Sequence, residues 1–211
     1  MARYTDAVCR KCRRIGEKLF LKGERCYSPR CAIERRRRPP GNAMPRRRRP
    51  TEWSIQLREK QKARLIYGVL EHQFRRYFDI ARESSGATGD NLIQLLESRL
   101  DNIVFRLSFA DSRAQARQLV NHGHFTVNER RMDIPSYLVA PGDVIVWKRN
   151  GQNGSTPEYI EALTNGLPKR PVPSWLTLDV GALKGEMVML PQSTEADTGI
   201  ESRLIVEFYS K

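Results

Sequence analysis

Long hydrophobic runs are missing from this sequence. Its longest apolar stretches, such as Val144 to Trp147 and Met187 to Leu190, contain four residues each. A membrane-spanning helix needs roughly 18 such residues, so no span and no membrane partner are expected. The N-terminus also has no apolar segment after its first charges and therefore does not resemble a secretory signal. These absences favour a cytoplasmic protein.

Signatures of catalysis are missing as well. The chain has no glycine-rich phosphate loop, and neither a paired carboxylate nor a nucleophile lies near His122 and His124 in the sequence. A histidine beside a helix end is more often a hydrogen-bonding or RNA-contacting group than a general acid or base. We therefore expect a protein that is not an enzyme and has no small-molecule substrate.

Acidic residues are scarce at the N-terminus. Residues 1–50 hold 17 Lys plus Arg against 4 Asp plus Glu, whereas residues 51–211 hold 20 against 20. The net charge of +13 therefore lies entirely in the first 50 residues. A basic arm on a charge-balanced body is typical of a chain whose one end neutralises phosphates. The alternatives are a solvated, disordered basic tail or one that binds any polyanion.

No cysteine occurs after residue 31. The four that are present form two close pairs, Cys9-x2-Cys12 and Cys26-x4-Cys31. Two such pairs joined by a short loop have the spacing that surrounds one tetrahedral metal ion. Four protein ligands fill the coordination shell, which favours one structural zinc ion per chain over a catalytic one. Disulfides, which persist mainly in oxidising compartments, and an iron–sulfur cluster are the alternatives.

Cations flank these cysteines and continue beyond them. Beside the predicted ligands lie Arg10, Lys11, Arg13, Arg14, Arg25 and Arg30. Two runs of four arginines follow: Arg35, Arg36, Arg37, Arg38 and then Arg46, Arg47, Arg48, Arg49. Proline and glycine between the runs exclude a regular helix, so this linker should lie extended on its partner. Arginine grips phosphate through two hydrogen bonds and stacks on bases, which indicates a nucleic acid.

Helices are predicted in the middle of the chain. Thr51 can cap a helix that runs to about Tyr67 and stops at Gly68. The next helix places Phe74, Tyr77, Phe78 and Ala81 on one stripe, which indicates core residues. Leucines and isoleucine between 92 and 107 predict one further helix.

A short helix and a hairpin follow. Ser112-x-x-Gln115 is a capping box, and the helix that it opens carries Arg113 and Arg117 on one strip that can face phosphate. Gly123 ends this helix in a left-handed conformation, and an alternating strand begins at Phe125. The predicted product is two helices followed by a small sheet.

Several segments, taken in order, resemble small-subunit ribosomal protein four in the form that carries four cysteines. They are Cys9 to Cys12, Leu21 to Pro29, Leu57 to Lys62, Leu96 to Asn102, Ala114 to His124 and Glu207 to Ser210. The resemblance covers nearly the whole chain, which one shared motif could not do. In the hairpin turn this chain has Asn128-Glu129 where many members have Asn-Gly, so the sequence leaves the turn length open.

The resemblance implies a structural constituent of the small ribosomal subunit and a primary binder of the 5′ domain of its ribosomal RNA, active early in assembly. It also implies a place where messenger RNA enters, beside ribosomal proteins three and five, with an effect on decoding accuracy. The implied RNA contacts of the helix and hairpin are Arg113, Gln115, Arg117, Gln118, His122 and His124. Arg46 to Arg49 resemble the stretch at the messenger, and the predicted RNA-binding set also includes Lys22, Arg58 and Lys62.

The expected fold is α+β: a mainly helical body with an inserted helix-helix-β-hairpin RNA-binding module, an N-terminal zinc knuckle and an extended basic linker. The predicted boundaries are 1–50 for the knuckle and arm, 51–96 plus 148–211 for the body with a C-terminal strand at 204–208, and 97–147 for the module.

Two other functions fit parts of the sequence. An RNA-modifying enzyme such as a pseudouridine synthase can carry the same module, but the residues after Trp147 resemble additions to the body more than a catalytic unit. A zinc-knuckle module that recruits proteins would touch RNA only incidentally. Both alternatives predict a free pool of protein, whereas a ribosomal protein should sediment with small subunits.

Overall fold

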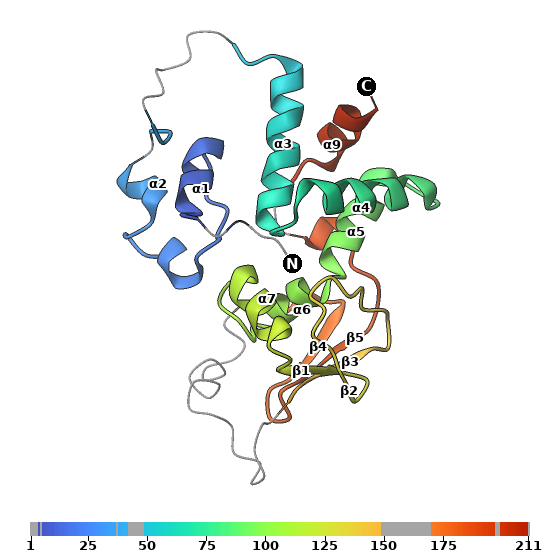
Figure 1. Cartoon of the computed structure of the whole chain (residues 1–211). Coiled ribbons are helices and arrows are strands. Elements are labelled where there is room, and N and C mark those ends of the chain that lie inside the picture. Colours follow the sequence, from blue (N-terminus) through green and yellow to red (C-terminus); the bar gives the residue numbers. More distant parts are fainter. Residues whose placement is uncertain are drawn as a thin grey trace. The chain divides into compact units, whose positions relative to one another are not determined.

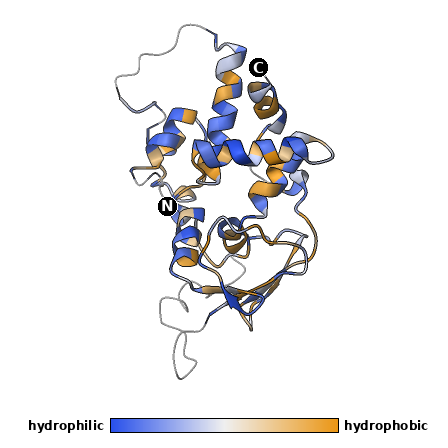
Figure 2. Ribbon diagram, turned by 45° about the vertical axis from the view of Figure 1, so that its right-hand side comes forward, coloured by the Kyte–Doolittle hydropathy of each residue, from blue (hydrophilic) through white to orange (hydrophobic). Residues whose placement is uncertain are grey.

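The computed structural model describes residues 4, 6–36, 38–41, 49–148, 170–196 and 199–210 (Figure 1). Its contacts divide the chain into two compact units, residues 1–93 with 196–211 and residues 94–195. Hydrophilic and hydrophobic residues interleave along the helix ribbons (Figure 2), as expected for helices that bury one stripe. Within the described ranges, no helix combines the length and the apolar character that crossing a membrane requires.

The N-terminal part of the first unit is made of short helical turns. They are α1 (Cys9–Ile15), the 3₁₀ turn η1 (Gly23–Cys26) and α2 (Ala32–Arg35). Gly16 ends α1 with a φ of +92°, and its N–H donates to the carbonyl oxygen of Cys12. The buried side chains here are Leu19 and three of the cysteines, a very small core for a segment of this length.

The described part of the first unit also contains four longer helical segments: α3 (Glu52–Ile66), α4 (Glu71–Glu83), the start of α5 (Thr88–Glu97) and α9 (Ser202–Tyr209). The predicted cap is confirmed, since the Thr51 hydroxyl accepts from the Ser54 N–H, and Gly68 follows with a φ of +64°. The predicted core stripe of α4 is also confirmed, because Phe74, Tyr77, Phe78 and Ala81 are buried.

The prediction of a C-terminal strand is wrong, because Leu204 to Phe208 lie in helix α9. Helical spacing lets Ile205 bury completely while Tyr209 packs against Phe78, with ring centroids 4.5 Å apart. Packing against α3 and α4 thus overrides the strand preference of the β-branched residues in this segment.

The predicted helix over 92–107 is broken into two. α5 ends at Glu97 and α6 (Leu100–Arg106) begins after Arg99, whose ψ of 137° is extended. Ser98 and Leu100 instead form backbone hydrogen bonds with the segment at residues 132–143, between two strands of the sheet described below. The Val139 N–H donates to the Ser98 carbonyl oxygen, and the Leu100 N–H donates to the Tyr137 carbonyl oxygen. These backbone hydrogen bonds replace the helical ones that the break removes.

The described strands of the second unit form an antiparallel five-stranded sheet in the order β2-β1-β3-β5-β4. The strands are β1 (Phe125–Val127), β2 (Arg130–Arg131), β3 (Val144–Trp147), β4 (Leu176–Asp179) and β5 (Lys184–Met187), and the 3₁₀ turn η2 (Ser193–Glu195) follows them. Helices α6 and α7 (Arg113–Asn121) contribute Leu100, Ile103 and Val120 to one core with this sheet. Phe109, Phe125 and Trp147 form an aromatic group at its centre.

Two strands come from a region that the sequence analysis assigned to the helical body, residues 148–211. In the structure β5 pairs with β3 and β4 pairs with β5, so Leu176 to Met187 belong to the second unit. Gly185 permits this pairing, because a Cβ at that position would lie 2.3 Å from a methyl group of Leu107. The second compact unit therefore extends beyond the predicted module, 97–147.

The hairpin turn that the sequence left open has two residues. Val127 pairs with Arg130, and Asn128 and Glu129 have φ values of +48° and +67°. Two consecutive left-handed residues define the tight turn that matches strand twist. Hydrogen bonds of the Asn128 side chain stabilise this left-handed turn. Its amide nitrogen donates to the Asp143 carboxylate at 2.7 Å, and its amide oxygen accepts from the Val144 N–H at 2.9 Å.

Candidate nucleic-acid interface

The four cysteines converge on one small cavity of about 10 Å³. Cys12, Cys26 and Cys31 are buried and Cys9 is partly exposed. The backbone N–H of Lys22 donates to the Cys26 sulfur at 3.3 Å. Amide donation of this kind orients a sulfur and stabilises it as an anion.

Two of the four thiols have a raised pKa. Burial raises the pKa of the Cys12 and Cys26 thiols, and the other cysteines raise it further. Among the described residues, no three or more His, Cys, Asp or Glu side chains are arranged to hold a metal ion as they stand. The four sulfurs are the donor atoms that zinc prefers, but their arrangement does not form a metal site as it stands. The zinc site stays a prediction.

Cations cover the outside of this knuckle, defined here as residues 6–36. Arg10, Arg14, Lys22 and Arg25 are exposed, and Lys11 lies over the Tyr4 ring with its Nζ 4.3 Å from the centroid. Arg13 instead anchors the linker, since its guanidinium donates to the carbonyl oxygens of Arg38 and Pro39 at 2.9 and 3.4 Å. The sequence analysis grouped these cations, and the structure separates Arg13, because its guanidinium is hydrogen-bonded to the linker backbone.

The arginine-rich linker is described only in part. Arg35, Arg36, Arg38 and Arg49 are exposed, whereas Arg37, Arg46, Arg47 and Arg48 lie outside the described residues. The predictions for those four arginines are therefore not addressed by the structure.

Lys62, which the sequence analysis placed in the RNA-binding set, is buried in the first unit. Its Nζ lies 2.9 Å from the Glu17 carboxylate and 3.5 Å from that of Glu59, and it donates to the Gly199 carbonyl oxygen at 2.6 Å. Burial lowers the pKa of Lys62, but the hydrogen bond to Glu17 and the charge of Glu59 outweigh burial and leave that pKa raised. Arg58, one turn earlier on α3, is exposed as expected.

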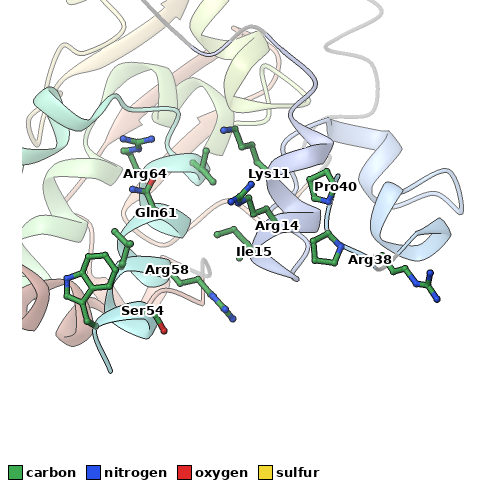
Figure 3. A pocket seen from close by; sticks show the side chains of 13 residues that line it. Lys11, Arg14, Ile15, Arg38, Pro40, Ser54, Arg58, Gln61 and Arg64 are labelled. Carbon is green, nitrogen blue, oxygen red and sulfur yellow. The ribbon is translucent and has the colours of Figure 1, made fainter. Parts of the chain in front are cut away.

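A groove of about 920 Å³ lies between α1 and α3 (Figure 3). Its lining residues are the apolar Ile15, Pro39, Pro40, Trp53, Leu57 and Leu65, the polar Ser54 and Gln61, and the basic Lys11, Arg14, Arg38, Arg58 and Arg64. In Figure 3 Arg14 extends from α1 toward α3, and Arg58 extends from α3. The lining contains cations but no carboxylate.

The helix of the second unit that was expected to face phosphate turns its arginines inward. Arg117 is buried and its Nη1 lies 2.9 Å from the Asp101 carboxylate. Arg113 donates to the Asn102 side-chain oxygen at 2.7 Å and lies over the Phe105 ring. The structure thus places Arg117 in the interior and Arg113 at its margin, while Gln118 is exposed.

Two buried carboxylates organise these arginines. Asp101 accepts from Arg99 at 3.0 and 2.7 Å as well as from Arg117, and Arg99 is completely buried. Glu97 accepts two hydrogen bonds from Arg106, at 2.9 and 2.7 Å, and one from the Asn102 amide. The acidic charge of this region is therefore neutralised inside the unit.

The capping box at Ser112 is confirmed in one half and modified in the other. The Ser112 hydroxyl accepts from the Gln115 N–H at 3.3 Å, and the Gln115 side chain accepts from the Asp111 N–H instead of the Ser112 N–H. Gln115 is accordingly occupied in holding the start of α7, and its predicted RNA contact would have to come from its remaining amide donors.

Exposed cations that the sequence analysis missed lie on the hairpin and directly after β3. Arg130, Arg131 and Lys148 are exposed, and no carboxylate among the described residues pairs with them. The Arg131 guanidinium packs over Gly123, where a Cβ would lie 2.4 Å from its Nε. The signal in the sequence was the pair Arg130-Arg131 directly after a turn, which alternation alone does not identify as functional. Glu129 and Asp133 are exposed in the same hairpin, so this surface is basic but not uniformly so.

The two predicted histidines adjoin these cations. His122 is exposed and His124 is half-buried, with ring centroids 6.0 Å apart. Burial lowers the pKa of His124, and the charges of His122 and Arg131 lower it further. His124 is consequently neutral at pH 7 and can serve as a hydrogen-bonding group.

Comparisons with known proteins assign both units to described families. Residues 3–97 match the ribosomal protein S4/S9 N-terminal domain, and residues 98–145 match the S4 domain. The chain is 53% identical over 211 residues to the small ribosomal subunit protein uS4A of Symbiobacterium thermophilum and to that of Alkaliphilus metalliredigens. It is also 53% identical over 211 residues to the small ribosomal subunit protein uS4 of Acetivibrio thermocellus. Each comparison covers 100% of both chains.

Proposed function

The chain belongs to the ribosomal protein S4 family, and from this premise we propose that it is a non-catalytic constituent of the small ribosomal subunit that binds the 5′ domain of its ribosomal RNA early in assembly. The cytoplasmic ribosome is its proposed location. Messenger RNA where it enters the subunit, and ribosomal proteins three and five, are the further partners that we propose, with an effect on decoding accuracy.

One observation carries the proposal for RNA. In the second unit the carboxylates of Glu97 and Asp101 are buried and paired with arginines, while Arg130, Arg131 and Lys148 stay exposed. Burying the acidic groups removes their repulsion for phosphate, and the exposed cations remain available to attract it. The exposed arginines of the knuckle and linker extend the same chemistry to the first unit.

Binding to a 5′-domain transcript, measured by filter retention of the full chain, tests this function. We expect the Arg130→Ala, Arg131→Ala double variant to bind more weakly, and we expect the slope of its salt dependence to fall by about one for each phosphate that the protein no longer neutralises. The matched control is Arg203→Ala on α9, whose side chain is 90% exposed and paired with Glu207. Equal affinity of the wild type for the transcript and for an unrelated RNA of the same length would refute the proposal.

We also propose that Cys9, Cys12, Cys26 and Cys31 hold one structural Zn²⁺. The support is the donor set: four sulfurs face one cavity, and the Lys22 amide donates to one of them. A bound zinc ion would supply folding free energy to a segment whose apolar core is too small to do so. The exposed cations around the knuckle would then be held on a fixed surface.

Chelation tests the zinc proposal. Removing the metal should abolish hydrogen-exchange protection of the amides in residues 6–31 and leave that of α3, α4 and the sheet unchanged. Native mass spectrometry should show one zinc per chain before chelation and none after it. Retained protection of the knuckle without metal would contradict a structural role.

A further inference from the structure

The groove between α1 and α3 combines features that phosphate binding alone does not require. Five cations line it and no carboxylate does. Arg64 is partly neutralised by Glu71, at 2.9 Å, but no described carboxylate pairs with Arg14 or Arg58. The groove is therefore positively charged, and its natural occupant is an anion.

An exposed tryptophan forms part of the same lining. Trp53 is 55% exposed, whereas Trp147 and Trp175 are each 2% exposed in the core of the second unit. Trp53 is held by Phe208, with ring centroids 6.2 Å apart and planes inclined by 43°. Lys60 in turn lies 4.5 Å from the Phe208 ring centroid. The indole is thus supported from α9 and still leaves much of its surface uncovered.

The groove is large enough for a nucleotide. Its volume of about 920 Å³ lies within the range of sites that enclose small organic molecules. Its second wall is fixed, because Arg13 on α1 holds the Arg38 and Pro39 carbonyl oxygens beside Pro40. An aromatic face, apolar walls and cations at the margin together suit a base joined to phosphates.

We propose that this groove binds one unpaired nucleotide of the RNA, with its base stacked on Trp53 and its phosphates paired with Arg14 and Arg58. The inference rests on the proposed function, because it takes RNA as the ligand. A paired duplex would offer phosphates but no free base face, so it would leave Trp53 without a partner. The groove thereby distinguishes single-stranded or bulged RNA from continuous helix.

Tryptophan fluorescence of the full chain tests this stacking. The probes are a short oligoadenylate and an abasic ribose-phosphate strand of equal length, which carries the same charge but no bases. Emission from Trp147 and Trp175 should stay constant because both are buried, so quenching reports Trp53. We expect oligoadenylate to quench the emission. Filter retention, which needs no indole, gives the affinities of the wild type and the variants for both strands. Oligoadenylate should bind about 5- to 150-fold more tightly than the abasic strand, the range that one stacked base supplies.

Three variants separate the base contact from the phosphate contacts. Trp53→Ala should lose the preference for oligoadenylate while its affinity for the abasic strand is unchanged. Arg14→Ala with Arg58→Ala should weaken both probes equally. Ile55→Ala, an exposed neighbour on α3 outside the groove, is the matched control and should behave as wild type.

Equal affinity of the wild type for both probes, or a preference that survives in Trp53→Ala, would overturn the inference. Binding to the 5′-domain transcript, measured in parallel, separates failure of the groove inference from failure of the proposed function. If that binding is specific while the base preference is absent, the groove inference fails and the proposed function stands. If neither RNA is bound, both fail.

Discussion

Asp101 should be the most costly single carboxylate to remove from the second unit. It is 4% exposed and accepts hydrogen bonds from two buried arginines, Arg99 at 3.0 and 2.7 Å and Arg117 at 2.9 Å. Asp101→Asn keeps the shape of the side chain and removes its charge. Two guanidinium groups then remain buried without this counter-charge.

The expected loss follows from that geometry. Removing one partner of a buried ion pair costs about 3–5 kcal/mol. A domain is typically stable by about 5–15 kcal/mol, so a large share of the stability is lost. At about 4 °C or more for each kcal/mol in a unit of this size, the melting temperature of the second unit should fall by at least about 12 °C.

Urea unfolding followed by tryptophan fluorescence measures this loss. A Trp53→Phe background leaves Trp147 and Trp175, both buried in the second unit, as the only reporters. The matched control is Asp133→Asn, which removes an exposed carboxylate of the same unit. Exposed charges of this kind are worth at most about 1 kcal/mol. If Asp101→Asn is no more destabilising than Asp133→Asn, the argument for a buried charge network is refuted.

Three further predictions follow from single residues. Lys62→Met should lower the melting temperature of the first unit and leave the salt dependence of RNA binding unchanged. Arg58→Ala should reduce the slope of that salt dependence by about one and leave the melting temperature unchanged. A reduced slope in Lys62→Met would contradict the buried position of Lys62. Burial raises the pKa of Glu71, but hydrogen bonds from Lys60 and Tyr209 outweigh burial and leave that pKa below the ordinary 4.5. The contribution of Glu71 to stability is therefore full above pH 4.5 and is lost as the pH falls through the lowered pKa. Urea midpoints should fall less steeply below that pH in Glu71→Gln than in the wild type, and parallel curves would exclude this contribution. Gly123→Ala should lower the free energy of unfolding by on the order of 1 kcal/mol, because the φ of Gly123 is +72°. The added Cβ should also displace the Arg131 guanidinium and weaken RNA binding. Unchanged affinity in filter binding would show that the position of Arg131 over Gly123 does not matter for RNA binding.

Local patterns in the sequence were sufficient wherever one residue or one stripe decides the structure. Thr51 caps α3, the aromatic stripe of α4 is buried, and the Ser112 hydroxyl caps α7. These features depend on neighbours within four residues, where the backbone fixes the geometry. The family assignment was also accessible from the sequence, because its motifs occur in order along the chain.

Long-range packing decided what the sequence alone could not. Leu204 to Phe208 form a helix because α3 and α4 offer a surface for it. Leu176 to Met187 belong to the second unit because β5 pairs with the edge of β3. The basic residues show the same limit. Arg117 and Lys62 are of the residue types that bind phosphate, yet they are buried in ion pairs with Asp101 and Glu17. The amino-acid sequence determined helices α3, α4 and α7, the cysteine cluster and the amount of positive charge. Only the tertiary structure decided which cations face outward, because that depends on carboxylates brought close by folding from other parts of the chain.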